Sequence, residues 1–153
     1  MHTSIERQVH VEASPEVVFE VISSPQHLRE WWPDEADLEP IAGATGEISW
    51  GDRASGKADV YPITVVDARP PRHFSFRWCY PAGATAGTDN SLLVTFELEP
   101  TADGTTVRLT ETGFRETKPD AAGRAELHQS HVEGWDLHVP RLADYLARLV
   151  ASR

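Results

Sequence analysis

Short runs of alternating apolar and polar residues predict that much of this chain forms β-strands. In "SIERQVHVEA", Ile5, Val9 and Val11 share one face and polar side chains the other, which is the period of a half-buried strand. From residue 41 to 113, similar runs are separated by Gly, Pro, Asn and Asp, which is typical of an antiparallel meander. We expect strands near 45–50, 58–67, 72–80, 91–99 and 105–113, with a hairpin turn at Asp103-Gly104 where glycine accepts a positive φ. One face of this sheet is apolar, through the alternating residues Phe74, Phe76, Trp78, Tyr80, Leu92, Val94, Phe96 and Leu98.

The period changes to that of a helix directly after the first strand. "SPEVVFEVISSPQHLREWW" opens with Ser14 as an N-cap and Pro15 at the first helical position, where a missing N–H costs nothing. Ser23, Ser24 and Pro25 interrupt the pattern before it resumes. The segment therefore predicts two short helices joined at a corner.

The C-terminal segment predicts one long amphipathic helix that covers the sheet. Its apolar stripe has spacings of three and four and consists of His128, Val132, Trp135, Val139, Leu142, Leu146 and Leu149. The matching surface is the apolar sheet face. We therefore expect an α+β fold with a curved antiparallel sheet of about six strands around a long C-terminal helix, and with two short helices after strand one.

Two helix-weakening residues interrupt this last segment. We expect Gly134, which has no side chain, to let the helix approach the sheet or a loop closely while Trp135 fills the space beside it. Pro140 cannot bond to the carbonyl of Asp136, which predicts a kink or break between these two residues, or a separate helix that begins at Pro140.

Composition and charge narrow the class of protein. The 153 residues suit a single domain spanning 1–153, and 40% hydrophobic with 25% charged residues is ordinary for a globular protein. A formal net charge of −10 would repel a phosphate backbone or an anionic lipid surface, so we expect neither nucleic acid nor a membrane as partner. A single cysteine, Cys79, and the lack of a signal-peptide pattern or a long apolar run favour a cytoplasmic protein.

Four segments, in this order and spacing, resemble the START-like (SRPBCC) superfamily with the helix-grip fold. They are "SPEVVFEVISSPQHLREWW", "VVDARPPRHFSFRW", "LVTFELEPTADGTTVRLTETGF" and "HVEGWDLHVPRLADYL". Within that superfamily they look most like the bacterial activator of heat shock protein 90 ATPase homologue-like proteins. The resemblance implies the fold, and it implies a hydrophobic small molecule bound between sheet and helix. It also implies that the chain could act on such a ligand, because some members are cyclases or hydrolases.

No catalytic motif is present. The candidate functional residues are therefore the polar side chains that the alternation along a strand places on the face directed toward the core. In the last predicted strand, Glu111 lies on the same face as Val107 and Leu109. In the first predicted strand, Arg7 lies on the same face as Ile5. A buried unpaired charge is costly. We therefore expect Glu111 to pair with Arg7 or to contact a ligand, unless the end of the strand twists it into water. We assign no catalytic residue.

The histidines of the last helix suggest a metal site that we reject. His131 and His138 fall beside the apolar stripe, and no cysteine or second carboxylate completes a ligand set, so we interpret both as solvated. His128 lies on the stripe and is a candidate hydrogen-bonding group at one end of the cavity, or a satisfied structural histidine. Cys79 lies opposite Trp78 with no basic neighbour, so we expect it to be unreactive. We expect no metal and no cofactor.

The tryptophans are candidates both for core packing and for the lining of a ligand pocket. We predict binding of a hydrophobic small molecule that is a lipid, an aromatic or a polyketide-like compound. The alternatives are a cyclase- or hydrolase-like enzyme using an inward Glu or His, and a chaperone ATPase activator-like interaction module; a homodimer is left open. The predicted ligand-binding residues are Trp32, Trp50, Phe76, Trp78, Phe96, Glu111, His128, Trp135 and Val139.

Overall fold

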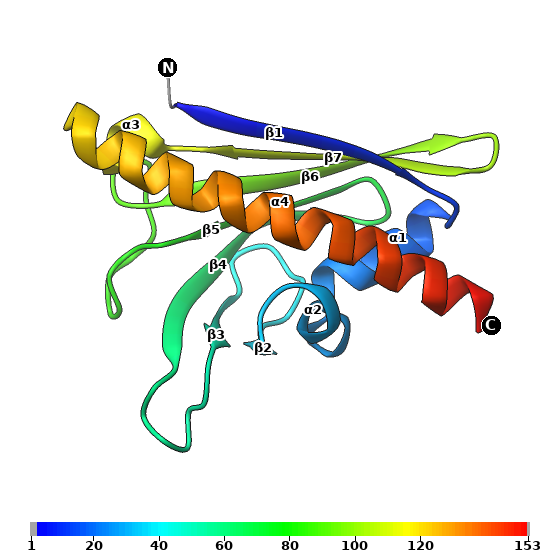
Figure 1. Cartoon of the computed structure of the whole chain (residues 1–153), viewed down its shortest axis with the longest axis horizontal. Coiled ribbons are helices and arrows are strands. Elements are labelled where there is room, and N and C mark those ends of the chain that lie inside the picture. Colours follow the sequence, from blue (N-terminus) through cyan, green and yellow to red (C-terminus); the bar gives the residue numbers. More distant parts are fainter. Residues whose placement is uncertain (1–2, 153) are drawn as a thin grey trace.

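A curved antiparallel sheet and a long helix that crosses it form the body of the protein (Figure 1). The structure is a computed structural model that describes residues 3–152. Within these residues the sheet has seven strands in the order β1-β7-β6-β5-β4-β3-β2. Their bounds are β1 Ser4–Val11, β2 Glu35–Asp37, β3 Thr45–Trp50, β4 Asp59–Arg69, β5 His73–Trp78, β6 Leu92–Thr101 and β7 Gly104–Thr112.

The structure confirms the predicted helix-grip fold and adds one strand to the predicted six. The added strand, β2, has three residues and pairs only with β3 at the edge of the sheet, through partners such as Ala36 and Ile48. Three residues are too few to show an alternating pattern. Strand β5 also ends earlier than predicted, because Cys79 has a left-handed backbone with φ 61°.

The two short helices after β1 are confirmed. Helix α1 spans Pro15–Ser23, and the Ser14 side chain caps it by accepting a hydrogen bond from the backbone of Val17. Helix α2 spans Pro25–Trp31 and begins directly after the Ser24 corner. A further one-turn helix that was not predicted, α3, spans Phe114–Thr117 after Gly113, whose φ is 104°.

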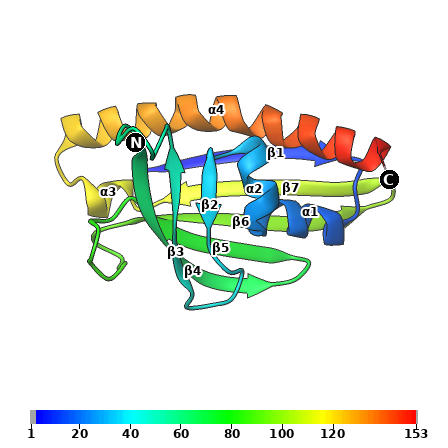
Figure 2. The same ribbon diagram turned by 90° about the horizontal axis from the view of Figure 1, so that it is seen from below.

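Helix α4 spans Ala121–Ala151 and lies along one face of the sheet (Figure 2). It presses Trp135, Leu142 and Leu146 into the core against the inward residues of the strands. The buried strand residues at the centre of this core are Phe74, Phe76, Trp78, Leu92, Val94, Phe96, Leu98, Val107 and Leu109.

The predicted break at Pro140 is wrong. Helix α4 continues through Pro140 as one element, and both views show α4 without a sharp bend along its length. Pro140 is exposed, so water can reach the Asp136 carbonyl that the proline ring leaves without a bond. Trp135 and Leu142 anchor the helix to the core on both sides of the proline, and this packing outweighs the local cost.

The hairpin between β6 and β7 is confirmed, but its glycine has another role. Thr101 pairs with Gly104, which leaves Ala102 and Asp103 as the turn, and Gly104 is not among the residues with positive φ. A Cβ atom at position 104 would overlap the carbonyl oxygen of Val11. Glycine is therefore required by the close approach of two chain segments rather than by the turn.

No helix within the described residues is both long and apolar enough to cross a membrane.

Candidate functional site

Four tryptophans from four separate elements meet beneath the middle of helix α4. Trp32 follows α2, Trp50 ends β3, Trp78 ends β5 and Trp135 lies on α4. The ring of Trp32 is central: it stacks on Trp135 at 5.5 Å and 23°, and its centroid lies 5.1 Å from that of Trp78 and 5.7 Å from that of Trp50. We call these four residues the tryptophan cluster.

A fully buried carboxylate, that of Glu111, lies behind the tryptophan cluster and holds it in place. The indole N–H of Trp78 donates to Oε2 at 2.8 Å, and the indole N–H of Trp135 donates to Oε1 at 2.9 Å. His131 Nδ1 lies 2.8 Å from Oε1. Indole nitrogens can only donate, so both carboxylate oxygens act as acceptors.

The inward orientation predicted for Glu111 is confirmed, but the predicted pair with Arg7 is wrong. Arg7 instead pairs with Asp136 of α4, with Nε 2.9 Å from Oδ1. Strand β1 is at the edge of the sheet, so the long Arg7 side chain reaches past the edge to the solvent-exposed side of the helix. Of the described residues, His131 is the basic side chain that lies within hydrogen-bond distance of the Glu111 carboxylate.

His131 and His138 were predicted to be solvated, and this interpretation is wrong. The His131 side chain is only 12% exposed, and its ring lies against Trp78 at 5.3 Å and edge-on to Phe114 at 5.7 Å. His138 is half-buried beside Trp50 at 6.1 Å. Both histidines lie one turn from Trp135, at i−4 and i+3, so their spacing from the buried tryptophan would have revealed their position.

A small recess opens between the tryptophan cluster and α4. Its volume is about 130 Å³, and it is lined by Trp32, Trp50, Trp78, Ser130, His131, Gly134, Trp135 and His138. We call it the tryptophan recess. Pockets for drug-sized ligands usually measure about 300 to 1,000 Å³, so this recess suits a much smaller group.

The predicted ligand-binding residues divide between this recess and the core. All four members of the tryptophan cluster line the recess, and Glu111 lies directly behind it. Phe76 and Phe96 are fully buried in the core and do not line the recess. Val139 packs against the core outside the recess.

His128 lies outside the recess, near the first turns of α4. Its Nε2 is 2.8 Å from the backbone carbonyl of Ser4, and its ring packs edge-on against Phe114 at 5.2 Å. These contacts tie α4 to the start of β1.

Gly134 lies at the recess, and the close approach predicted for it is wrong. A Cβ atom at position 134 would meet no heavy atom within 4 Å. The missing side chain therefore leaves open space at the recess, where the neighbouring Trp135 turns into the core.

Burial lowers the pKa of His138, a hydrogen bond to the Trp31 backbone partly opposes this effect, and the positive charge of Arg141 lowers the pKa a little further. The neutral ring must donate from one nitrogen to bond a carbonyl oxygen. Its Nδ1 is buried and has no hydrogen-bond partner among the described residues. His138 therefore lies at the edge of the recess as a neutral imidazole whose unpaired Nδ1 is covered by the protein.

Burial also raises the pKa of the Cys79 thiol, and the negative charge of Glu111 raises it further. A thiol of this kind is a poor nucleophile. Within residues 3–152, no three His, Cys, Asp or Glu side chains gather closely enough to hold a metal ion.

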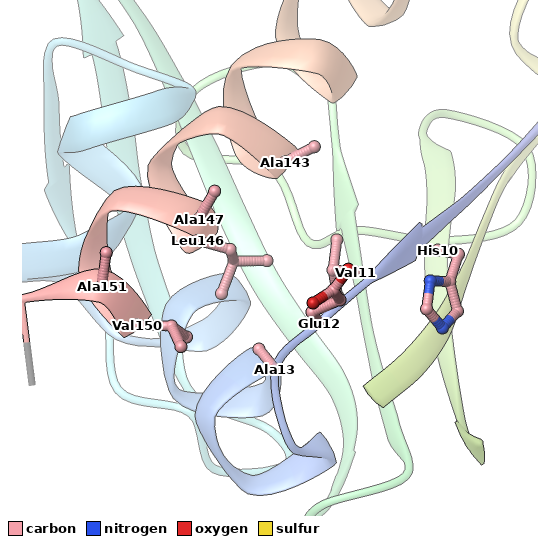
Figure 3. A pocket seen from close by; sticks show the side chains of 9 residues that line it. All are labelled: His10, Val11, Glu12, Ala13, Ala143, Leu146, Ala147, Val150 and Ala151. Carbon is pink, nitrogen blue, oxygen red and sulfur yellow. The ribbon is translucent and has the colours of Figure 1, made fainter. Parts of the chain in front are cut away.

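A larger groove of about 430 Å³ lies at the C-terminal end of α4. Figure 3 shows its residues, which come from the end of β1 and the last turns of the helix. They are mainly small and apolar, such as Ala13, Ala143 and Ala147, with His10 and Glu12 at the strand side. No tryptophan lines this groove.

Comparison with known proteins identifies a family and a fold. A family model described as "Activator of Hsp90 ATPase homolog 1-like protein" matches residues 12–147. No curated protein matches the chain. The chain is similar to the solved structure of protein MLL2253 from Mesorhizobium loti, with a TM-score of 0.75, 22% identity and coverage of 95% of this chain and 97% of that one.

Two further solved structures are similar. The solution structure of the Aha1 dimer from Colwellia psychrerythraea matches with a TM-score of 0.70 and 20% identity, over 94% of this chain and 95% of that chain. DynU16, from the dynemicin biosynthetic locus, matches with a TM-score of 0.71 and 23% identity, over 95% of this chain and 47% of that chain. At these identities the likeness shows a shared fold and does not transfer a ligand or an activity.

Proposed function

This chain belongs to the activator of Hsp90 ATPase homolog 1-like family, and from this premise we propose that it binds a small hydrophobic molecule in the tryptophan recess. The observation that carries the proposal is the convergence of four indole rings on one recess between sheet and helix. Large flat side chains around a recess suit a flat apolar ligand, because they offer extensive contact area with little loss of side-chain entropy.

The size of the recess favours one aromatic ring, or the terminal ring of a larger molecule. An engineered apolar cavity of about 150 Å³ in another protein binds benzene, which is close to the volume available here. Three of the four indole N–H groups are already bonded within the protein: Trp78 and Trp135 donate to Glu111, and Trp50 donates to the carbonyl of Trp32. The tryptophans of the recess therefore present mainly ring faces and edges to a ligand.

The test is a titration with p-xylene, a one-ring probe without polar groups, followed by tryptophan fluorescence and by calorimetry. We expect saturable binding to the wild-type protein. Replacement Gly134→Leu should abolish this binding, because a side chain at position 134 starts in open space at the recess and would occupy it. Glu133→Leu is the matched control: it adds the same side chain one residue away, at an exposed position of the same helix. Binding that survives in Gly134→Leu, or that is absent in the wild type, would contradict the proposal.

A second candidate function is a cyclase- or hydrolase-like enzyme, favoured by the inward His131–Glu111 pair. A carboxylate that fixes one imidazole nitrogen leaves the other able to act as a general base. The test is turnover of small aryl esters by the wild-type protein and by His131→Gln. Equal slow rates for the two proteins would reject the enzyme and leave the binding proposal standing.

We also propose that the chain forms a homodimer, because a relative with the same fold is described as a dimer. Sedimentation velocity over a range of protein concentrations tests this assembly directly. A single species with the mass of one 17.0 kDa chain at all concentrations would reject it.

A further inference from the structure

We infer that the ring bound in the tryptophan recess carries a hydroxyl group, and that this hydroxyl hydrogen-bonds to Nε2 of His131. The ligand class is thus a phenol or a larger molecule that ends in a phenolic ring. This inference rests on the proposed binding function and adds the chemistry by which the recess selects its ligand.

The His131 ring has a fixed orientation. Its Nδ1 is held by Glu111 at 2.8 Å, and its faces and edges are held by Trp78 and Phe114 at centroid distances of 5.3 and 5.7 Å. The position of Nε2 at the opposite side of the ring is therefore also fixed. A preorganised polar group loses little entropy when it binds a ligand.

Nε2 of His131 is the ring nitrogen that remains for a ligand. The Glu111 carboxylate already accepts from two indoles and can only accept from His131 as well, so Nδ1 carries a proton. When Nδ1 carries the single proton of the ring, Nε2 has a lone pair, and no hydrogen bond from the described residues occupies it. His131 lines the recess, so this lone pair is available to a ligand there.

The other polar groups of the recess also favour a neutral ligand. Among the described residues no lysine or arginine lines it, and besides His131 its polar side chains are Ser130 and His138. A recess without a cation disfavours a carboxylate or a phosphate, and the net charge of −10 acts in the same direction. The aromatic ring of a phenol can pack against the tryptophan rings, and its neutral hydroxyl can donate a hydrogen bond to the lone pair of His131.

The experiment compares p-cresol with p-xylene, which has a methyl group in place of the hydroxyl and nearly the same shape. We expect p-cresol to bind wild-type protein about three- to tenfold more tightly, the range for one net hydrogen bond. If neither probe binds, the proposed binding function fails and the inference fails with it. If both bind and p-xylene binds equally well or better, the inference is overturned while the binding function stands.

Variants locate the preference on one histidine. In His131→Phe we expect p-xylene to bind at least as well as p-cresol, because no acceptor remains at this position. The control His128→Phe makes the same change one turn away, outside the recess, and should keep the preference for p-cresol. A preference that survives in His131→Phe would overturn the inference.

A measurement on the wild-type protein does not depend on whether His131→Phe folds. Nitrogen NMR of the imidazole rings at pH 8 should show His131 protonated on Nδ1 and unprotonated on Nε2. Addition of p-cresol should shift the Nε2 resonance, and addition of p-xylene to the same occupancy should leave it nearly unchanged. A protonated Nε2 in the free protein, or equal responses to the two probes, would overturn the inference.

Discussion

Trp135 of helix α4 donates its indole N–H to the fully buried carboxylate of Glu111 on β7 at 2.9 Å. The same carboxylate accepts from Trp78 on β5 and bonds to His131 one helical turn before Trp135. One acidic side chain therefore joins two strands to the covering helix at the point where the recess forms. A buried carboxylate is tolerated here because both of its oxygens accept hydrogen bonds, from Trp78 and from Trp135.

Replacement Glu111→Gln should destabilise the protein by about 1 to 3 kcal/mol, the cost of leaving a buried donor unsatisfied. The amide has one acceptor oxygen, whereas Trp78 and Trp135 donate to different oxygens of the carboxylate. In either orientation the amide N–H₂ faces a donor. Urea unfolding followed by circular dichroism measures the change.

Glu133→Gln is the control for this experiment. It makes the same chemical change at an exposed position of α4 and should alter the unfolding free energy by no more than about 0.5 kcal/mol. If the two variants were equally stable, the Glu111 carboxylate would have no role in holding the tryptophans.

The fold followed from the sequence because alternation and helical spacing record burial directly. The alternation of residues along the strand was sufficient to predict that Glu111 points into the core. It failed for Arg7, because parity fixes the face of a strand but does not show that an edge strand lets a long side chain reach Asp136 of the helix. Alternation also could not predict β2, because three residues are too few to show it and the strand is defined by its pairing with β3.

The site was less accessible to sequence reasoning because it is assembled from distant segments. Trp32, Trp50, Trp78 and Trp135 are separated by up to about a hundred residues in the sequence, and no spacing rule brings them together. The position of His131 could have been found from its i−4 relation to Trp135. The prediction that His131 is solvated failed because the apolar stripe was assigned to His128 and Val132 alone in this part of the helix. The buried face of a helix is wide enough to include the neighbouring row of residues.

Replacement Pro140→Ala should stabilise the protein by about 2 kcal/mol. Alanine restores the N–H that can bond to the Asp136 carbonyl and removes the crowding of the ring, which together are worth about 3 kcal/mol in a helix interior. Alanine also gives the unfolded chain more conformational freedom than proline does, which reduces this stabilisation by about 0.4 to 1 kcal/mol. Thermal and urea unfolding measure the net effect.

Pro25→Ala is a matched control for that substitution. Pro25 is at the first position of α2, where proline interrupts no hydrogen bond, so its replacement should be neutral or destabilising by up to about 1 kcal/mol. A Pro140→Ala protein no more stable than the wild type would mean that the helix has already adapted fully to the proline.

Cys79 should react slowly with iodoacetamide at pH 8 in the folded protein and rapidly in urea. Burial, reinforced by the charge of Glu111, raises the pKa of the thiol, and the thiolate is the reacting form. Mass spectrometry of labelled protein over time gives both rates. Similar rates in the folded and unfolded states would show that Cys79 is not protected by its environment.

Acidification should destabilise the protein through His138. Burial, together with the charge of Arg141, lowers the pKa of this histidine in the folded state below its ordinary value of 6.5, which applies to the unfolded chain. Above pH 6.5 both states are neutral at this position and the effect is absent. Below it the unfolded state takes up a proton first, so the free energy of unfolding falls until the pH has also passed the lowered pKa of the folded state.

His138→Gln isolates this contribution, because glutamine keeps a polar side chain and does not titrate. We expect the unfolding free energy of the wild type, minus that of the variant, to be constant between pH 7.5 and 8.5 and to decrease as the pH is lowered from about 6.5. Urea titrations of both proteins across this range measure the difference. A difference that stayed constant or increased on acidification would show that protonation of His138 does not oppose folding. Such a result would mean that water or a charged partner reaches the imidazole at the edge of the tryptophan recess.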